Sequence, residues 1–497
     1  HNTLIGAFAG DNLAGGGNNV AIGNYALSTE DTHGRNVAVG YGALTTQDAG
    51  AEAYNVAVGY LAGTAVTTGV RNVLIGGLAG DALTTGGYNT AIGYQALSTE
   101  DAHGYNTAIG YATLIAQDAG ADAYNTAVGY YAGVAVTTGT NNVIVGGLAG
   151  DSITTGNHNI VLGRQALSTE DAHGYNVAIG GYALQDQNAG VDAYNVAIGY
   201  SAAKELTTGT YNTILGTQAM STGITTGNYN VAIGYKAGDT ITSGYENTLV
   251  GGLAGDAITT GLGNTALGMK ALSTDTTGRY NVAIGNGTLE NQSFAGNEGV
   301  YNVAVGYAAG NAVTTGTQNT LVGGNAGDAM TIANNNVAIG VNALGAETEG
   351  DRNVAIGNYA LATQNNSDAD TYNVAVGWVA GQLVTTGVRN TLIGSNAGEA
   401  LTTGSYNVAI GFQSLSLEDA NGSSTALGYR TLQNQNAGAE SYNVAVGHDA
   451  GRNVSTGINN VLVGALAGDA LTTGNYNTVL GHEALTLEDA YGKNTAI

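Results

Sequence analysis

The stretch Asn19-Val20-Ala21-Ile22-Gly23 recurs, with small changes, from one end of this 497-residue chain to the other. The position of its first residue recurs 29 times between residues 2 and 494. It is occupied by Asn in every copy except one, which has Ser424. The step from one copy to the next is 17 in 21 of the 28 intervals and between 18 and 21 in the others. The glycine four residues later is present in all 28 copies that extend that far. This periodicity indicates a repeat architecture.

A repeat this short cannot bury a core alone, so consecutive repeats must stack on one another. We therefore predict an all-β, parallel β-solenoid, or β-roll, with coils of about 17 residues. The chain contains no Pro, and we see no linker or composition change that would mark a domain boundary. We interpret residues 1–497 as a single continuous solenoid array, cut as a segment from a longer protein because it begins and ends inside repeats.

The coil that begins at Asn125 shows the expected local structure. Thr126 and Val128 alternate with Ala127, and β-branched residues at alternate positions are typical of a strand with one buried face. We expect that face to be the β-branched one. The following Gly129 ends or bends this strand, and a second short strand is expected at Ala-Val-Thr-Thr, residues 135–138. Each coil would then hold two short strands and two turns.

The stacking predicts ladders of identical residues along the solenoid. The recurring Asn side chains should bond from coil to coil, as Asn ladders do in stacked sheets. Residues of these structural ladders include Asn19, Asn36, Asn55, Asn72, Asn89 and Asn106, with Gly23, Gly40, Gly59, Gly76, Gly93 and Gly110.

A longer period overlies the short one. The intervals 17, 17, 19 and 17 sum to 70, and Glu-Asp pairs recur at that distance at 30–31, 100–101 and 170–171. We infer four-coil modules of about 70 residues. Carboxylates in every fourth coil lie about 19 Å apart, beyond the Debye length of about 8 Å. We expect these pairs to be exposed, solubilising charges.

Composition excludes several functions. The formal net charge is −25 with only 12 Lys and Arg residues, which disfavours nucleic acid or an anionic membrane surface as a partner. There is no Cys for disulfides or thiolate metal sites. We find no apolar run of about 18 residues for membrane insertion. We find no catalytic constellation and predict that the protein is not an enzyme, and we expect no cofactor.

One cluster has ligand-type side chains. Candidate metal ligands, none of them assigned with confidence, are Asp31, His33, Asp101, His103, Asp171 and His173, in clusters that also contain Glu30, Glu100 and Glu170. Asp48 with Glu52 and Asp118 with Asp122, in the longer coils, belong to the same class. A cation such as Ca²⁺ could bind there. The spacing matches no specific metal motif, and we interpret the cluster as an exposed polar turn.

Tyrosine precedes the recurring Asn in many coils. Such a ladder could stack on the sugar rings of a glycan, or it could cover a turn and fill an interface between chains, which is the interpretation we favour. Paired Thr residues before the closing glycine suggest ice binding only distantly, because adjacent residues of a strand face opposite ways. The surface or interface tyrosines include Tyr54, Tyr88, Tyr105, Tyr124, Tyr175 and Tyr194.

The phrase Asn89-Thr90-Ala91-Ile92-Gly93 resembles the YadA-like head repeats of trimeric autotransporter adhesins. It is equally similar to the Asn-Thr-Ala-Ile-Gly repeats of long phage tail-fibre proteins. The resemblance covers nearly the whole chain, and in the adhesins it implies a left-handed β-roll of three wound chains. The adhesin coil is shorter than this one, and the segment shows no coiled-coil stalk, membrane anchor or chaperone domain.

We therefore expect an extracellular fibre shaft, on a virion tail or a cell surface, that is a rigid homotrimer presenting a receptor-binding tip. Any glycan or receptor would bind through regions outside this segment. The alternative is a self-assembling extracellular filament or surface-layer protein whose rods join end to end. A glycan- or ice-binding solenoid is a more distant alternative.

Overall fold

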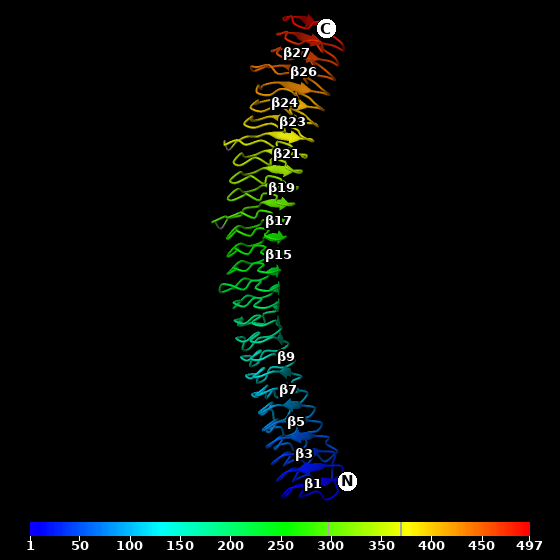
Figure 1. Ribbon diagram of the computed structural model, residues 1–497, viewed down its shortest axis with the longest axis vertical. Helices are drawn as coiled ribbons and strands as arrows, with labels where there is room; N and C mark the ends of the chain where they lie inside the picture. Colours follow the sequence, from blue (N-terminus) through cyan, green and yellow to red (C-terminus); the bar gives the residue numbers. More distant parts are fainter. Residues whose placement is uncertain (297, 368–369) are drawn as a thin grey trace. The chain divides into compact units, whose positions relative to one another are not determined.

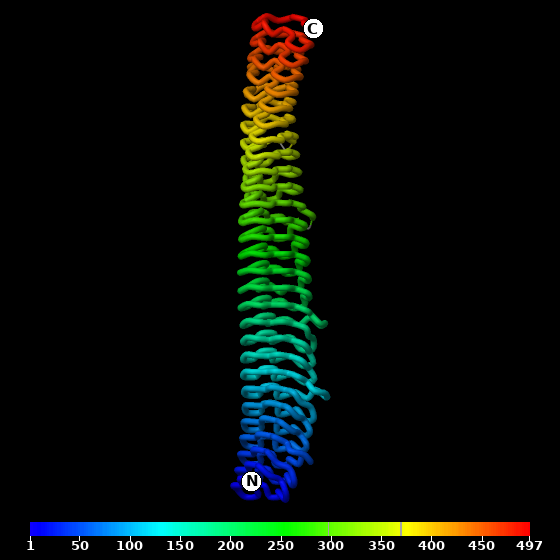
Figure 2. Tube along the Cα trace, turned by 90° about the vertical axis from the view of Figure 1, so that its right-hand side faces the viewer, coloured from blue at the N-terminus to red at the C-terminus, as the bar shows by residue number. Residues whose placement is uncertain are grey.

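The computed structural model describes residues 1–296, 298–367 and 370–497, which form two compact units, His1–Glu246 and Asn247–Ile497. Each unit is a stack of coils with one short strand per coil, as Figures 1 and 2 show. No helix of the described residues is long and apolar enough to cross a membrane. The strands of the first unit are β1 (Thr3–Ile5), β2 (Val20–Ile22), β3 (Val37–Val39), β4 (Val56–Val58), β5 (Val73–Ile75), β6 (Thr90–Ile92), β7 (Thr107–Ile109), β8 (Thr126–Val128), β9 (Val143–Val145), β10 (Ile160–Leu162), β11 (Val177–Ile179), β12 (Val196–Ile198), β13 (Thr213–Leu215) and β14 (Val231–Ile233).

The second unit repeats this arrangement. Its strands are β15 (Thr248–Val250), β16 (Thr265–Leu267), β17 (Val282–Ile284), β18 (Val303–Val305), β19 (Thr320–Val322), β20 (Val337–Ile339), β21 (Val354–Ile356), β22 (Val374–Val376), β23 (Thr391–Ile393), β24 (Val408–Ile410), β25 (Thr425–Leu427), β26 (Val444–Val446), β27 (Val461–Val463), β28 (Thr478–Leu480) and β29 (Thr495–Ala496).

Within each unit, every strand pairs in parallel with the strand of the next coil. In β4 and β5, for example, Val56 pairs with Val73 and Ala57 with Leu74. The register is the same in pair after pair, so equivalent residues of successive coils lie directly above one another. The prediction of a parallel β-solenoid built from short, regularly spaced coils is therefore confirmed.

The strand side chains face the opposite way from the sequence prediction. In β2–β28 the middle residue is buried, and the two β-branched or aliphatic residues beside it are partly or fully exposed. Ala127 is fully buried, whereas Thr126 and Val128 face outward. The middle residue is alanine in many coils, where larger side chains from the turns, such as Leu97 and Leu114, fill the interior. In other coils it is larger, as at Leu74 and Ile144, and the turn then supplies Gly80 or Gly150 against it. The interior is thus filled by a complementary pair of positions, and the two strand residues beside the middle one are left outside.

The second strand of each coil is also not formed as expected. Residues 135–138 lie in turns and bends, although Thr137 donates its N–H to the carbonyl of Thr154 in the next coil at 2.9 Å. The segment therefore bonds along the stack without the continuous pairing of a strand. An isolated bridge between Leu206 and Thr225 marks the same segment elsewhere.

Left-handed backbone closes the corners of the coil. The glycine after each strand has a positive φ, which is +137° at Gly146. A Cβ added to Gly146 would lie 2.6 Å from the carbonyl oxygen of Gly163, one coil later. The residue before each recurring Asn is commonly left-handed as well, with φ of 60° at Tyr88 and 63° at Tyr105. Two requirements, the dihedral angle and the close approach of the next coil, therefore explain the recurring glycine.

The longer coils accommodate their extra residues in loops. In the first unit these loops lie near residues 50, 120 and 190, and Figure 2 shows loops that project from the stack. The turn at Gly120 has a φ of +68°, and a Cβ added there would meet nothing within 4 Å, so the loop is open to solvent. Insertions are thus confined to one corner of the coil and leave the strand ladder in register.

Candidate functional site

The recurring Asn side chains form a buried column along each unit. The Oδ1 of each Asn commonly accepts the backbone N–H of the next Asn along the stack. Its Nδ2 commonly donates to the carbonyl of the residue 14 positions later, which closes its own coil. Asn72, for example, donates to Gly86 O at 2.9 Å and accepts from Asn89 N at 2.9 Å. The predicted ladder residues Asn19, Asn36, Asn55, Asn72, Asn89 and Asn106 all donate their backbone N–H in this way, over 2.8 to 3.0 Å.

Ser424 replaces Asn in this column, and its surroundings differ accordingly. Its hydroxyl bonds to that of Ser441, and Gln435 Nε2 donates to both hydroxyl oxygens at 2.9 Å. The residue equivalent to Ser441 in the coils of the first unit is Ala53, Ala123 or Ala193. A second hydroxyl and the Gln amide therefore occupy the space that the Asn amide fills in other coils.

Once in each module, a carboxylate enters the interior beside this column. Glu30, Glu100 and Glu170 are fully buried, so the interpretation of an exposed polar turn is wrong for the glutamate of each Glu-Asp pair. The aspartates Asp31, Asp101 and Asp171 are exposed, as expected. Burial raises the pKa of the Glu100 carboxyl above its ordinary value of 4.5, and the hydrogen bond from the His103 backbone opposes that rise.

The clusters at Glu100 and Glu170 contain polar atoms without hydrogen-bond partners among the described residues. The Oε1 of Glu100 accepts the backbone N–H of His103 at 3.1 Å. Its Oε2, the Nδ1 of His103, the Nδ2 of Asn106 and the Nε2 of Gln117 are all buried and unpaired. The equivalent atoms of the Glu170 cluster also lack a hydrogen-bond partner, namely Glu170 Oε2, His173 Nδ1, Asn176 Nδ2 and Gln187 Nε2. Such atoms are costly in a protein interior and mark places where a ligand or a water is expected.

The equivalent clusters of the second unit lack the histidine and are satisfied. Gln292 donates to Asp275 at 2.7 Å, Gln364 to Glu347 at 2.8 Å and Gln435 to Glu418 at 3.0 Å. The Glu30 cluster contains a histidine and is satisfied as well, since Asn36 Nδ2 donates to Glu30 Oε2 at 3.5 Å and Thr32 Oγ1 lies 3.0 Å from His33 Nδ1. Among these clusters, the unpaired atoms therefore belong to those at Glu100 and Glu170. The glutamine was not singled out in the sequence, although its recurrence at 47, 117 and 187, one module apart, would have identified it.

The structure brings the predicted metal-ligand candidates together. One potential ligand atom from each of Glu30, Asp31, His33 and Asp48 lies within 4.8 Å of the others. The same holds for Glu100, Asp101, His103 and Asp118, and for Glu170, Asp171 and His173. In the first two clusters the last aspartate comes from the next coil, so each set spans two coils. The glutamate is the buried member of each cluster.

The predicted tyrosines form an exposed row in which rings stack along the solenoid. Tyr88, Tyr105 and Tyr124 stack with ring centroids 5.0 Å apart. Tyr175 and Tyr194 belong to a second run, also at 5.0 Å. Tyr54 lies outside these runs. The guanidinium of Arg35 lies over its ring in a cation–π contact, 5.2 Å from the centroid. Because the ring faces within a run are covered by their neighbours, edges and hydroxyls face solvent. Sugar stacking would need those faces, so the arrangement favours an interface.

A second aromatic row follows the glycine on the other side of the strand, and sequence analysis did not single it out. Tyr94, Tyr111 and Tyr130 stack at 5.5 and 5.7 Å and are exposed. The Gly-Tyr pair that follows many of the strands was the available signal. The outward strand residues therefore lie between two aromatic rows.

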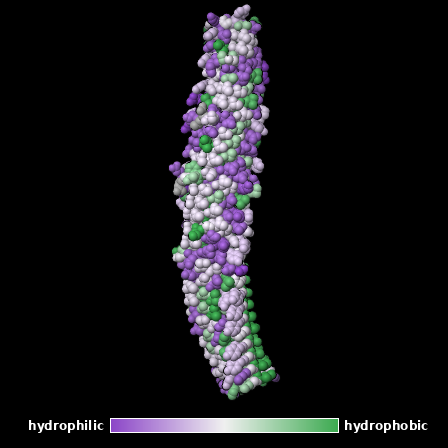
Figure 3. Space-filling view, turned by 60° about the vertical axis from the view of Figure 1, so that its left-hand side comes forward, coloured by the Kyte–Doolittle hydropathy of each residue, from purple (hydrophilic) through white to green (hydrophobic). Residues whose placement is uncertain are grey.

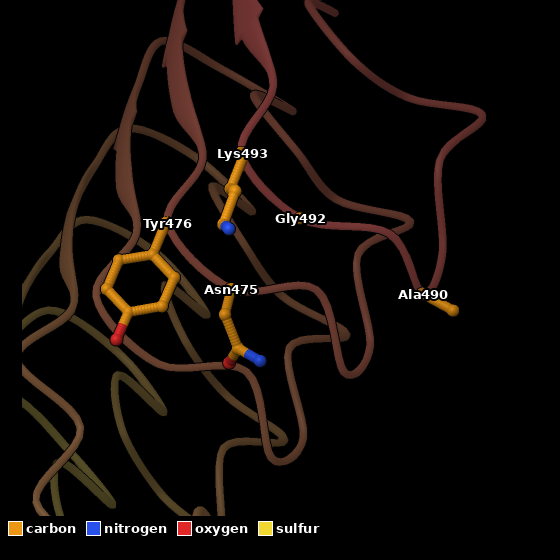
Figure 4. Close-up of a pocket in the computed structure, with 5 residues that line it drawn as sticks. All are labelled: Asn475, Tyr476, Ala490, Gly492 and Lys493. Carbon is orange, nitrogen blue, oxygen red and sulfur yellow. The ribbon is translucent and has the colours of Figure 1, made fainter.

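The pockets of this surface are shallow. The one in Figure 4 lies between consecutive coils and is lined by Asn475, Tyr476, Ala490, Gly492 and Lys493. Its polar atoms already serve the stack, since Asn475 Oδ1 accepts from Ile458 N at 2.7 Å and Asn475 O accepts from Lys493 N at 2.8 Å. These lining residues include no nucleophile paired with a base.

No family model and no curated protein sequence matches this chain. The fold defines its class as a parallel β-solenoid of tandem repeats, and the resemblance to adhesin and tail-fibre repeats stays a prediction.

Proposed function

We propose that this chain is a shaft segment of an extracellular fibre, of the kind carried by phage tails or cell-surface adhesins, and that it self-associates side by side. A β-solenoid braced by a hydrogen-bonded column in coil after coil suits a structural fibre shaft in general, because each coil restrains the next. The lateral partner is a second copy of the chain, and the resemblance to trimeric adhesins favours three copies.

The outward face of the strands is the observation that carries this proposal. Neighbouring coils expose 39% of Val143 and 40% of Ile160. In the other coils of β2–β28 the first strand residue is Val or Thr and the third is Val, Ile or Leu, and both are partly or fully exposed. Figure 3 shows a column of hydrophobic groups along one edge of the N-terminal coils. A monomeric protein rarely exposes so long an apolar stripe, whereas interfaces between chains do.

The exposed area is sufficient for a stable interface. One or two partly exposed aliphatic side chains and, in many coils, an exposed tyrosine present roughly 100–200 Å² per coil. About four to eight coils then supply the roughly 800 Å² that each partner buries in an interface of standard size. Each unit carries the stripe over many more coils than that, so either unit alone has enough area for a lateral interface.

The extracellular location rests on composition and on the resemblance. A chain without Cys needs no particular redox environment, and a net charge of −25 keeps a filamentous assembly soluble. Receptor recognition belongs to a tip outside residues 1–497.

The test is the oligomeric state of the purified chain, measured by light scattering and native mass spectrometry. We expect a trimer, and we expect V143K/I160K to shift it toward monomer while circular dichroism stays unchanged. T85K/T155K is the matched control, because it adds the same two charges at exposed turn positions away from the strands. A wild-type monomer would overturn the proposal, as would V143K/I160K that associates like the control. Open-ended assemblies that lengthen with concentration would instead support the end-to-end filament.

A further inference from the structure

We propose that the histidine-containing clusters at Glu100 and Glu170 are binding sites for a divalent transition-metal cation of the Zn²⁺ type. The first site consists of Glu100, Asp101, His103 and Asp118 and spans two adjacent coils, and the second consists of Glu170, Asp171 and His173. The Glu30 cluster is not included, because His33 Nδ1 lies 4.0 Å from Glu30 Oε1 and both His33 Nδ1 and Glu30 Oε2 already have hydrogen-bond partners. This inference is independent of the proposed fibre role, because it concerns the inside corner of the coil rather than the outward strand face.

The distance between the imidazole and the buried carboxylate fits a shared metal. His103 Nδ1 lies 3.5 Å from Glu100 Oε1, and His173 Nδ1 lies 3.4 Å from Glu170 Oε1. A charge-assisted hydrogen bond would be about 2.7–2.9 Å long. Two ligands held about 2.0–2.1 Å from a tetrahedral Zn²⁺ are separated by about 3.3 Å. Both pairs are within the distance of an ion pair but longer than a charge-assisted hydrogen bond, and their spacing matches that of two ligands on one ion.

Unpaired buried atoms provide the second argument. Glu100 is fully buried, yet one of its carboxylate oxygens has no hydrogen-bond partner among the described residues, and neither has the buried Nδ1 of His103. The same is true of Glu170 and His173. A cation would satisfy the imidazole nitrogen and neutralise the buried charge at once. It would also relieve repulsion between this carboxylate and the aspartates that lie within 4.8 Å of it.

The chain provides its own metal-free comparison. Glu418 occupies the same place in a later module, but Asn421 stands where the histidine would be. There the carboxylate accepts hydrogen bonds from Asn421 N at 3.2 Å and from Gln435 Nε2 at 3.0 Å. Where histidine is absent, the carboxylate is thus satisfied by protein groups alone.

The donor set identifies the class of ion. Imidazole with carboxylates suits Zn²⁺ and related transition metals, whereas Ca²⁺ takes oxygen ligands and would leave the histidine unused. The site at Glu170 has Asn188 in place of the aspartate from the next coil, so we expect it to bind more weakly than the site at Glu100.

The test uses the full chain without an affinity tag, stripped with a chelator and titrated with ZnCl₂ by calorimetry. We expect about two equivalents of Zn²⁺ per chain, and a higher melting temperature in Zn²⁺ than in chelator. Variant H33N/H103N/H173N copies the natural Asn421 arrangement and should lose this uptake. The matched control H158N/H448N/H482N removes three histidines outside the clusters and should keep it.

Two further measurements separate coordination from misfolding. Co²⁺ substituted for Zn²⁺ should give visible absorption bands in the wild type and not in H33N/H103N/H173N, whose circular dichroism should match the wild type. Asp118→Asn reproduces the donors of the Glu170 site and should weaken one site only. If the stripped wild type takes up no Zn²⁺, or the cluster variant takes up as much as the control variant, the proposal is wrong.

Discussion

The backbone N–H of Asn142 donates to Oδ1 of Asn125, one coil earlier, at 2.9 Å. The Oδ1 of Asn142 in turn accepts the N–H of Asn159 at 2.9 Å, and its Nδ2 closes the coil on Gly156 O at 2.9 Å. All three Asn side chains are fully buried. One short amide therefore satisfies a backbone donor of the next coil and a backbone acceptor of its own coil, because it carries both an acceptor oxygen and a donor nitrogen.

Replacing Asn142 by Ala should leave the N–H of Asn159 and the carbonyl of Gly156 buried without partners. At about 1–3 kcal/mol for each such group, we expect a local loss of roughly 2–5 kcal/mol. Hydrogen exchange read by mass spectrometry is the appropriate measurement, because a repeat array does not unfold in two states. The loss of protection should centre on the coils that begin at residues 142 and 159.

Asn24 is the control for this prediction, since its side chain is exposed and outside the column. Asn24→Ala should change exchange rates little. Equal effects of the two substitutions would show that the column does not brace the coils.

Gly146→Ala should be among the most damaging small substitutions. It combines a φ of +137° with a Cβ 2.6 Å from Gly163 O, so we expect a cost of at least about 3 kcal/mol. Gly120→Ala meets only the strain of a φ of +68° in open space and should cost about 1 kcal/mol. Gly324→Ala, with neither strain nor contact, should be neutral or stabilising by a few tenths of a kcal/mol.

Thermal unfolding of the three glycine variants, measured side by side, tests that order. A Gly146→Ala variant as stable as Gly324→Ala would contradict the account of the recurring glycine.

The pair Ser424 and Ser441 should behave as a coupled unit. Ser424→Asn alone places an amide against the Ser441 hydroxyl and Gln435, so we expect no gain in stability. The double variant S424N/S441A recreates the Asn176 and Ala193 combination of an earlier module, in which Asn176 Nδ2 and Gln187 Nε2 are buried without hydrogen-bond partners, so we expect it to be less stable than the chain itself by about 1 kcal/mol. A double-mutant cycle measures the coupling, and strictly additive effects would contradict it.

The buried Asp275 should make the chain more stable in mild acid. Burial raises its pKa above the ordinary value of 3.8, although the hydrogen bond from Gln292 opposes the rise. Between 3.8 and the raised pKa the folded chain binds more protons than the unfolded chain, so the free energy of unfolding falls as pH rises through that window. The pKa values of the Glu30, Glu170 and Asp328 carboxyls are raised by burial as well, so these groups act in the same direction.

Melting temperature as a function of pH, compared between wild type and Asp275→Asn, tests this linkage. The wild type should lose more stability between mild acid and neutrality than the variant. Parallel pH profiles of the melting temperature would show that Asp275 does not contribute to the pH dependence of stability.

The sequence determined much of the fold, because regular spacing makes identical demands on every coil. The recurrence of Asn and Gly at a nearly constant period predicted stacked coils and in-register parallel strands. The longer, four-coil period likewise located the clusters at His33, His103 and His173 along the chain. Local residue identity was sufficient for these features because neighbouring copies provide the partners.

Tertiary structure alone decided which way the side chains face. Thr126, Ala127 and Val128 alternate in a pattern that either face could bury, and the closed coil buries the middle residue, which is alanine here and Ile144 in the next coil. Charge suggested that Glu100 is exposed, yet its place at the inside corner of the coil buries it against the His103 backbone N–H. Interior width and the supply of backbone donors are properties of the closed coil, so a linear pattern of residues does not contain them.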